Sequence, residues 1–457
     1  MDDHEMFVMA RQDYDIEGKG PYDGTSFEID TVTPQVPRRE LHGGHPRRGI
    51  DEPRADFPAK TVFPTPRTTF GWGTYRTAGE EAQALNMDEA LIVTTGLSST
   101  NIIEKVTEVL DDSGVGSHVY DGVTSNPKDF EVHEAYELQQ ESNADGIVAV
   151  GGGSAIDCAK GVRLVEAHDG RDITEFEGVS QAENPSNLPM LAMSTTAGTG
   201  SETTIYSVIS DTDEEYKMAL ADLGMLNSAA IIDPALHRTM PPELTAWTGM
   251  DALTHAIEAY ISRLGVESNK AMAIEAIRMV ANSLRQAYGN GNNADAREEM
   301  AWGQYLAAQA FNSAGLGIVH PMAHILGGVY DLPHGLCNSI ALPAVMEYNA
   351  TAASEEMADI AERGFGVDTS DMTQMEAAYR AVEEVEKLKA DINVTQTWEE
   401  IGMQREDLEK CGEYAYDDFC TEGNARDLDP ETITQLFTVN FEDPWVRWDP
   451  ETDRVSI

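Results

Sequence analysis

The spacing of apolar and polar positions changes along the chain and divides it into regions of two kinds. Between about 70 and 235, apolar runs of strand length alternate with stretches of helical pattern. The apolar runs lie at 90–94, 146–150, 190–193 and 229–232, and the helical stretches include 101–110 and 129–140. Short apolar strands separated by helices are typical of a parallel sheet that is covered on both faces. This part of the chain therefore predicts an α/β domain.

After Pro241 and Pro242, long helical stretches rich in Ala, Met, Leu and Glu follow one another. They cover 243–262, 269–288, 294–313, 372–391 and 406–418. Few β-branched runs interrupt them, which favours helices. We therefore expect an irregular arm over 1–60, an α/β N-terminal domain over 61–238 and an all-α C-terminal domain over 239–457. The arm is rich in Pro, Gly, Arg and Asp and has no sustained period.

The charge of the chain is strongly acidic. It has 80 Asp and Glu against 31 Lys and Arg, which gives a formal net charge of −49. Such a surface repels nucleic acid and anionic membranes, so neither is expected as a partner. The hydrophobic content of 41% is too high for a disordered acidic chain, so the acidic residues are expected on the surface of a folded protein. We hypothesise a halophilic source, because molar salt shortens the Debye length to about 3 Å and screens the self-repulsion.

The cysteines and the apolar runs indicate in which cellular compartment the protein is expected. Cys158, Cys337, Cys411 and Cys420 show no C-x-x-C spacing, which fits free thiols in a reducing cytosol. The first residues, MDDHEMF, contain no apolar signal region, and no run of about 18 apolar residues occurs. We expect a cytoplasmic protein without a membrane anchor.

Four of the eleven histidines fall between 251 and 334, together with one well-placed acid. Asp251 and His255 are four residues apart in a stretch without Pro or Gly, so one helix face carries both. His320 and His324 have the same spacing, and His334 follows ten residues later. A carboxylate with three imidazoles suits a divalent transition metal that keeps one position open for a substrate. The alternative, an exposed acid and scattered histidines, would fit one such pair better than the whole set.

Two glycine-rich turns follow predicted strands. The run 146–150 leads into Gly151-Gly-Gly-Ser154 and then a helical stretch, and 190–193 leads into the sequence STTAGTGSE at 194–202. Glycines let the backbone approach a pyrophosphate, a helix start offers unpaired N–H groups, and Ser154 is expected as hydroxyl donor and N-cap. Neither turn is the G-x-G-x-x-G fingerprint of an ordinary Rossmann domain. Each alone could be a tight turn without ligand, but together they predict a dinucleotide at the strand ends.

Over roughly residues 60 to 443 the chain resembles the iron-dependent (group III) alcohol dehydrogenases. The shared elements are FGWG at 70–73, GGGSAIDCAK at 151–160, TTAGTGSE at 195–202, IIDPALHRTMPPELTAWTGMDALTHAIEAY at 231–260 and HPMAHILGGVYDLPHG at 320–335. The resemblance implies a dehydroquinate synthase-like fold in which an α/β domain binds NAD or NADP and an all-α domain binds metal. It also implies hydride transfer between a small alcohol and C4 of the nicotinamide, or the reverse reduction of an aldehyde or ketone. Homo-oligomers, dimers in particular, are common in the family.

The resemblance also implies site residues. The metal ligands would be Asp251, His255, His320 and His334. Three imidazoles and a carboxylate suit Fe2+ and also Zn2+, and the resemblance favours iron. His324 would be the catalytic group that handles a proton. The cofactor would lie on Gly152, Gly153, Ser154, Thr195, Thr196, Thr199 and Lys217. The structural alternatives are that Thr195 only ends a strand and that Lys217 is a surface cation.

Thr95 marks a departure from the family. Many members that use NAD carry an Asp after the first strand, where it binds the adenosine ribose, but this chain reads Ile92-Val-Thr-Thr95-Gly96. Without that carboxylate a 2′-phosphate is not repelled, so both NAD and NADP are possible cofactors.

Other functions remain open on the same residues. Hydroxyacid–oxoacid transhydrogenases, maleylacetate reductases, zinc glycerol dehydrogenases and dehydroquinate synthases share this architecture. The few Lys and Arg in the helical part disfavour the phosphate substrate of the last of these. A salt-adapted protein that stores or senses metal is an alternative without catalysis, but it leaves both glycine turns unexplained.

Overall fold

The computed structural model describes residues 62–184, 186–214, 216–439 and 441, together with the backbone of 447–449 and 454–456. The arm expected over 1–60 lies outside the described residues. In the described part, no helix combines the length and apolar character needed to span a membrane.

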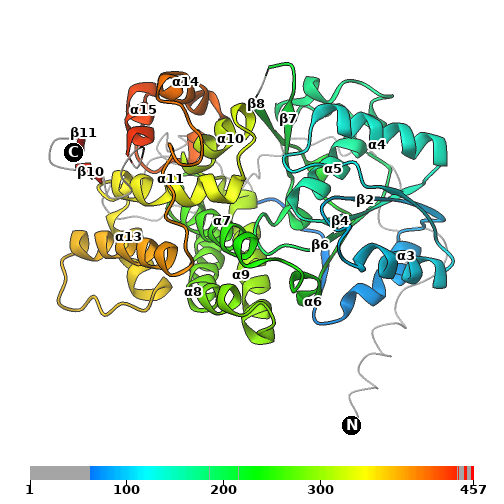
Figure 1. Ribbon diagram of the computed structural model, residues 1–457, viewed down its shortest axis with the longest axis horizontal. Helices are drawn as coiled ribbons and strands as arrows, with labels where there is room; N and C mark the ends of the chain where they lie inside the picture. The colour runs from blue at the N-terminus through cyan, green and yellow to red at the C-terminus, as the bar shows by residue number, and fades with distance from the viewer. Residues whose placement is uncertain are drawn as a thin grey trace, which may run out of the picture. The chain divides into compact units, whose positions relative to one another are not determined.

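A six-stranded parallel sheet organises the N-terminal half (Figure 1). Its strands, in spatial order, are β1 (Arg67–Phe70), β9 (Ala229–Ile232), β6 (Met190–Ser194), β4 (Gly146–Gly151), β2 (Glu89–Thr94) and β3 (Gly116–Tyr120). The four predicted strands are confirmed as β2, β4, β6 and β9. The register pairs Thr94 with Val150 and Gly151 with Ser194, so neighbouring strands end at one level. The chain reverses direction across the sheet between β2 and β4, where a crevice for a ligand forms in open α/β sheets.

Alternate side chains of the strands pack on opposite faces, as the two-residue period requires. Leu91 and Val93 of β2 contact α4 (Asp129–Ser142) and α5 (Gly153–Ala167) in one apolar cluster. Ala90 and Ile92 belong to the other cluster, with α2 (Ala78–Ala84) and α3 (Ile102–Asp112). In Figure 1, α4 and α5 lie above the sheet and α3 below it. The sheet is therefore covered on both faces, as predicted.

A second, three-stranded sheet was not predicted. It consists of β5 (Gly178–Val179), β8 (Tyr216–Ala221) and β7 (Tyr206–Asp211), with β7 and β8 antiparallel. It packs against α5 on one side and α10 (Val319–Val329) on the other. This sheet carries Lys217 to the boundary between the two halves of the molecule.

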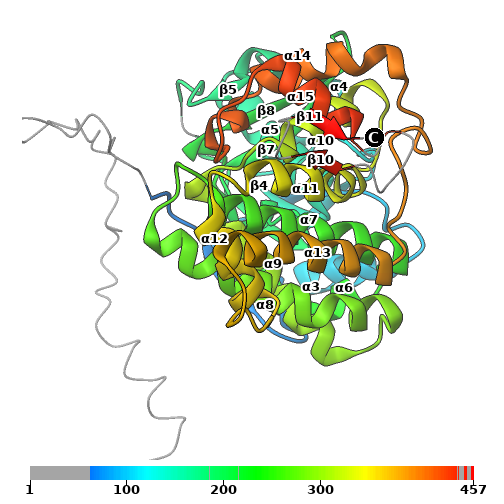
Figure 2. The same ribbon diagram turned by 90° about the vertical axis from the view of Figure 1, so that its left-hand side faces the viewer.

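The C-terminal half is helical around one apolar cluster, and Figure 2 views the molecule from that side. The expected stretches form α7 (Pro242–Ile261), α8 (Glu267–Gly289), α9 (Ala294–Ala314), α13 (Gln374–Asp391) and α14 (Leu408–Asp417). Not predicted were α6 (Pro234–His237), α10, α11 (His334–Asn349), α12 (Ser354–Asp359) and α15 (Pro430–Thr438). The predicted class, an α/β part followed by a helical part, is confirmed.

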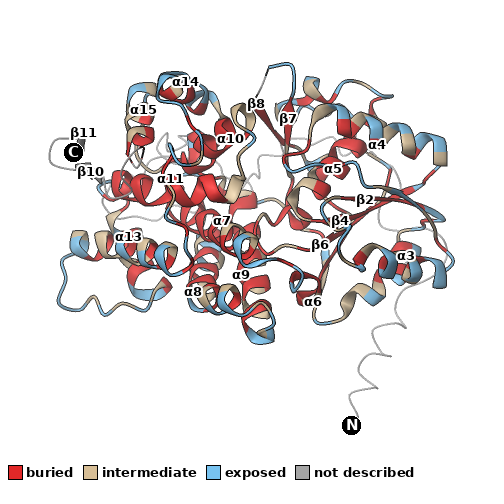
Figure 3. Ribbon diagram, viewed as in Figure 1, coloured by how far each residue is buried: buried red, intermediate tan, exposed pale blue. Residues whose placement is uncertain are grey.

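The turn after β6 joins the two halves. A Cβ on Gly200 would lie 2.2 Å from Cβ of Ala308 in α9, and one on Gly198 would lie 2.8 Å from Cβ of Thr248 in α7. Gly200 also has a φ of +65°, which favours glycine. In Figure 3 the ribbons of β4, β6 and α7 on the two sides of this boundary are largely buried. The turn 195–202 is thus held between the sheet and the helices by residues that allow close backbone approach.

Candidate functional site

Three of the predicted metal ligands converge from three helices. Oδ1 of Asp251, in α7, lies 3.9 Å from Nε2 of His320, in α10, and 3.6 Å from Nε2 of His334, at the start of α11. Their donor atoms all lie within 4.8 Å of one another. Asp251 and His320 are buried, and His334 is partly buried. Residues 83 positions apart in sequence thus share one small volume.

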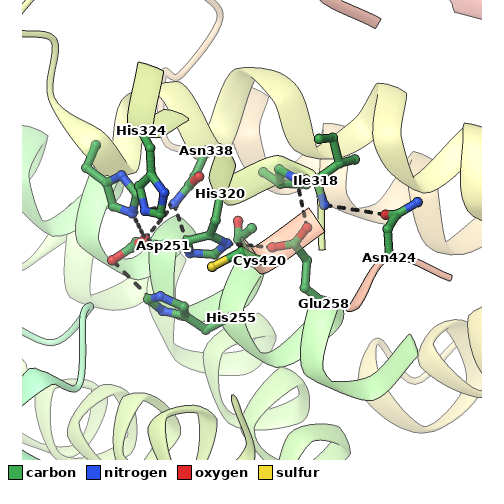
Figure 4. A network of polar contacts seen from close by, with 12 residues as sticks. Asp251, His255, Glu258, Ile318, His320, His324, Asn338, Cys420 and Asn424 are labelled. Carbon is green, nitrogen blue, oxygen red and sulfur yellow. Dashed lines mark hydrogen bonds and ion pairs between the residues drawn. The ribbon is translucent and has the colours of Figure 1, made fainter. Parts of the chain in front are cut away.

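His255 joins this group from the same face of α7 as Asp251 (Figure 4). Its ring stacks on His320 and on Phe311, both at 4.4 Å between ring centroids. Its Nδ1 lies 4.0 Å from Oδ2 of Asp251 and is buried without a hydrogen-bond partner among the described residues. The structure therefore places His255 beside the three donors, with one ring nitrogen available.

Glu258 supports the cluster and was missed by the sequence reasoning. It lies one turn beyond His255, and its Oε2 accepts a hydrogen bond from Nδ1 of His320 at 2.5 Å. Its other oxygen accepts the backbone N–H of Val319 at 2.8 Å. With Nδ1 of His320 protonated, Nε2 presents its lone pair to Asp251 and His334.

Asn338 was missed as well. It lies one turn after His334 in α11 and is fully buried. Its Nδ2 donates to Oδ1 of Asp251 at 2.7 Å and lies 3.3 and 3.1 Å from Nε2 of His320 and of His334. Its amide head therefore touches all three converging donors.

The electrostatics of the cluster suit a cation. Burial raises the pKa of Asp251, against the lowering effect of His255 and Asn338. Burial lowers the pKa of His255 to about 3 and lowers the pKa values of His320 and His334 well below the usual range. The imidazoles are thus neutral, with lone pairs free to coordinate, and a divalent cation would compensate the buried carboxylate. The residues present fit the predicted metal.

His324 lies next to this cluster but outside the group of three donors. Its ring stacks on that of His334 at 5.3 Å, and its Nδ1 is 2.7 Å from Oδ2 of Asp418. Burial alone would raise the pKa of Asp418, but the charge and hydrogen bond of His324 outweigh it and hold that pKa below its ordinary value. Asp418 was not predicted, and its partner is 94 residues away in sequence.

The two predicted glycine turns lie against each other at the carboxyl ends of β4 and β6. The N–H of Thr195 donates to the carbonyl of Gly151 at 2.8 Å. A Cβ on Gly152 would lie 3.1 Å from Thr196, and one on Gly153 would lie 2.7 Å from Thr199. The predicted cofactor residues of the turns are thus neighbours, and the approach is closest at Gly153, where Thr199 would have to move to admit a side chain.

One local prediction at this turn was wrong. Ser154 was expected as N-cap of the following helix, but α5 begins at Gly153 and its N-cap is Gly152. The extended backbone of Gly152 ends the strand and starts the helix directly, so Ser154 lies inside the first turn. Its side chain still lines the cavity described below.

A buried polar network lies beneath the turns and was not predicted. Nζ of Lys160, in α5, donates to Oγ of Ser201 at 3.0 Å and to the carbonyls of Thr204 and Tyr206 at 2.9 and 2.6 Å. Ser201 also donates to Asp157, which in turn accepts the N–H of Val208 at 3.0 Å. This network fixes the second turn and β7 relative to α5.

Thr95 and Lys217 occupy different surroundings. Thr95 follows β2, and its Cγ2 would lie 3.8 Å from a Cβ on Gly151, so it adjoins the first turn. Lys217 is only 7% exposed, so the alternative that it is a surface cation is wrong. Burial lowers the pKa of Lys217 to about 8. Its side chain packs against Gly327 in α10.

A cavity of about 120 Å³ connects these parts. Its lining includes Gly153, Ser154, Thr199 and Lys217 on the cofactor side and His255, His320, His324 and His334 on the helical side. A wider cavity of about 460 Å³ adjoins it and shares Lys217, His324 and Phe419. The donor cluster and the glycine turns therefore face one space.

Comparisons with known proteins agree with this arrangement. The family model "Iron-containing alcohol dehydrogenase" matches residues 64–234, and "Fe-containing alcohol dehydrogenase family, C-terminal" matches 245–441. A methanol:N,N-dimethyl-4-nitrosoaniline oxidoreductase of Amycolatopsis methanolica is 39% identical over 412 residues, which cover 84% of this chain and 96% of that protein. An NAD-dependent methanol dehydrogenase of Bacillus methanolicus is 38% identical over 375 residues, 82% of this chain and 98% of that protein.

Among solved structures, a 1,3-propanediol oxidoreductase superposes with a TM-score of 0.80 at 38% identity. The match covers 83% of this chain and 99% of that one. The similarity thus spans both the sheet and the helical part.

Proposed function

The chain belongs to the iron-containing alcohol dehydrogenase family, whose members use a nicotinamide cofactor and a divalent metal, and on that premise we propose how its residues divide the work. The reaction is hydride transfer between a small alcohol and the nicotinamide, or reduction of the corresponding carbonyl compound. The observation that carries this proposal is the common cavity, because donors from the helical side and glycine turns from the sheet line it together.

We assign the metal to Asp251, His255, His320 and His334. A bound divalent cation supplies Lewis acidity, which lowers the pKa of an alcohol hydroxyl. The protein's part is to present neutral imidazoles and one carboxylate from rigid helices, with Glu258 holding the ring of His320. Fe2+ fits the family, and the donor set also suits Zn2+.

We assign the cofactor to Gly152, Gly153, Ser154, Thr195, Thr196, Thr199 and Lys217. A nicotinamide held by these residues would supply the acceptor or donor of the hydride. The glycines permit close approach to the N–H groups that begin α5, the hydroxyls offer hydrogen bonds, and Lys217 places a cation at the cavity. Thr95 replaces the family's ribose-binding Asp, so we propose that the chain accepts NADP as well as NAD.

We assign proton handling to His324. Asp418 binds its Nδ1 and so leaves Nε2 as the nitrogen that exchanges a proton with the substrate hydroxyl or with water. His324 lines both cavities, so a proton taken in the inner one has a route to the wider one.

The dimensions of the inner cavity support a small substrate. Tyr206, Phe311 and Phe419 line it, with ring centroids of Tyr206 lying 5.7 and 6.3 Å from those of the other two. These three rings make part of the cavity wall apolar. Short alcohols and aldehydes fit such a space better than long-chain ones.

A second candidate function uses the same site but a different final acceptor of the hydride. In a transhydrogenase-type reaction the hydride taken from the alcohol would reach a second substrate, and the cofactor would not leave the protein between the two half-reactions. The similarity to the methanol:N,N-dimethyl-4-nitrosoaniline oxidoreductase of Amycolatopsis methanolica, an enzyme named for methanol and an added acceptor, favours this alternative. The two reactions are distinguished by supplying alcohol and an added acceptor. In the transhydrogenase-type reaction alcohol is consumed, but reduced cofactor never accumulates free in solution.

Further properties belong to the proposal. We propose a cytoplasmic, halophilic homodimer, the salt adaptation resting on the net charge of −49. We also retain domains at 61–238 and 239–457, after an arm over 1–60. The matched ranges 64–234 and 245–441 are consistent with that boundary.

The test combines metal analysis of anaerobically purified protein with a panel of alcohols and aldehydes, NAD+ and NADP+, in high salt. We expect bound iron and turnover of short alcohols. His255→Ala and His334→Ala should lose metal and turnover together, whereas His324→Ala should keep the metal and lower kcat. Metal loss in His324→Ala would show that the ligands are misassigned.

A further inference from the structure

We propose that Asn338 supplies its side-chain amide oxygen as an additional ligand of the cation. This inference rests on the proposed function, because it takes Asp251, His320 and His334 as ligands of one divalent metal. It adds to that set a neutral oxygen from a residue that the sequence did not single out.

The position of Asn338 in α11 brings it to the donors. Asn338 follows His334 by four residues, so one face of the helix carries both. The side chain is fully buried and lies with Asp251 and His320 in Figure 4. It therefore repeats the spacing by which α7 presents Asp251 and His255.

The distances place the amide head where a neighbouring ligand would lie. Ligand atoms about 2.1 Å from one cation lie about 3.0 Å apart in octahedral geometry and about 3.4 Å apart in tetrahedral geometry. Nδ2 of Asn338 lies 2.7, 3.1 and 3.3 Å from the donor atoms of Asp251, His334 and His320. Asp251 lies 3.6 and 3.9 Å from the two imidazole nitrogens. The distances from Nδ2 of Asn338 to His334 and His320 fall in that range, its 2.7 Å to Asp251 lies just below it, and the 3.6 and 3.9 Å from Asp251 lie above it.

The hydrogen bonding of the amide points the same way. Two N–H groups of Asn338 face three acceptor atoms, whereas Oδ1 is buried and has no hydrogen-bond partner among the described residues. A cation between the donors would repel the N–H dipoles and attract the oxygen. Rotating the side-chain amide by 180° exchanges Oδ1 and Nδ2, which have nearly the same shape. A carbonyl oxygen is a good ligand for hard divalent cations.

The competing role is that of a positioning residue. In that case Nδ2 would keep its hydrogen bond to Asp251 and the oxygen would never reach the metal. The two roles differ in the number of ligands that the metal has, and not only in its affinity. A probe of coordination number therefore decides between them.

The experiment uses Co2+ with the full-length protein. The visible d–d bands of Co2+ become more intense as the number of ligands around the ion falls. Affinity is measured by competition with a chelating dye, and folding by circular dichroism. Asn338→Leu removes the oxygen, Asn338→Asp keeps an oxygen but loses the N–H donor, and Asn349→Leu is the control. Asn349 is buried in the same helix and donates to Asn424 at 3.0 Å instead.

We expect Asn338→Leu to bind Co2+ at least about tenfold more weakly, with more intense bands. Asn338→Asp should keep the wild-type bands and bind at least as tightly, and Asn349→Leu should change neither property. Two results would overturn the proposal. One is that the Co2+ bands of Asn338→Leu equal those of the wild type, and the other is that the bands of Asn338→Asp become more intense, as expected for a site with one ligand fewer. If Asn338→Leu does not fold, the bands of Asn338→Asp decide. Failure of the wild-type protein to bind Co2+ would instead refute the metal centre itself.

Discussion

At the residue scale, the pair of His324 and Asp418 defines which imidazole nitrogen can serve the cavity. The side chain of Asp418 is only 12% exposed, yet its pKa stays low because His324 and the N–H of Cys420 bind it. The carboxylate on Nδ1 orients the ring and leaves Nε2 facing the cavity. The pair therefore has the arrangement of a general acid–base group with an orienting partner.

We predict that Asp418→Asn lowers kcat and changes the pH–rate profile while the metal content stays at the wild-type level. The amide keeps the shape but removes the carboxylate charge that contacts Nδ1 of His324. The loss should be smaller than the roughly hundredfold loss expected for His324→Ala, which removes the proton carrier itself. Steady-state kinetics across pH, together with metal analysis, measure this. The exposed Asp368→Asn serves as control, and an unchanged pH profile in Asp418→Asn would argue for a purely structural role.

The residues of the site differ in how far sequence could reveal them. The pairs Asp251/His255 and His320/His324 stood out by their helical spacing, and His334 by its place ten residues further on. The choice of Asp251, His255, His320 and His334 as the ligands came from the resemblance to the family. Glu258 and Asn338 carried a weaker signal, since they continue the faces of Asp251 and His334 by seven and four residues, but Glu and Asn at such positions are common on any helix. Asp418 carried no signal, because its contact depends on how α10 and the segment after α14 pack.

At the element scale, the glycine turns are placed by contact between two strand ends. The space for a side chain at Gly153 is taken by Thr199, whose Cγ2 would lie 2.7 Å from an added Cβ. This turn and the turn after β6 therefore fit together only while one partner lacks a side chain. The cofactor site depends on that fit.

We predict that Gly153→Ala destabilises the protein by about 1–3 kcal/mol through overpacking and raises the dissociation constant of NAD+. Thr199→Ser removes the nearest methyl group, so the double variant should recover part of both losses. Thermal unfolding and calorimetric titration with NAD+ measure the two effects. Strictly additive losses in the double variant would mean that the two turns are not coupled.

The elements that sequence predicted were those with unambiguous periods. The buried strands β2, β4, β6 and β9 are continuous apolar runs because both of their faces are covered. The outer strands β1 and β3 were missed because their side chains are largely exposed or half-buried and their sequences are mixed. The helices α10 and α11 were missed because Pro and Gly interrupt them, although tertiary packing overrides that local preference.

At the scale of the whole molecule, Lys217 connects the small sheet with the helical half. It extends from β8 to Gly327 in α10 and lines both cavities. Because burial lowers its pKa to about 8, its charge depends on pH near neutrality. The ammonium form predominates below that value and the neutral amine above it.

We predict that NAD+ binds more weakly as the pH rises through about 8, because the cavity then loses the positive charge of Lys217. Lys217→Met should bind more weakly at pH 7 and should not show this pH dependence. Titration calorimetry between pH 6.5 and 9.5 would follow it. An identical pH dependence in Lys217→Met would assign the effect to another group.

The net charge of −49 acts on the molecule as a whole and leads to a prediction about salt. Self-repulsion among acidic groups destabilises a compact state, and it weakens as the Debye length falls from about 10 Å at 0.1 M to about 3 Å at 1 M salt. We therefore expect the thermal unfolding midpoint to rise steadily from 0.1 to 3 M KCl. Sucrose is the control, since it favours burial without screening charge. Full stability and activity at 0.1 M KCl, with no further gain in 3 M KCl, would remove the argument for a halophilic protein.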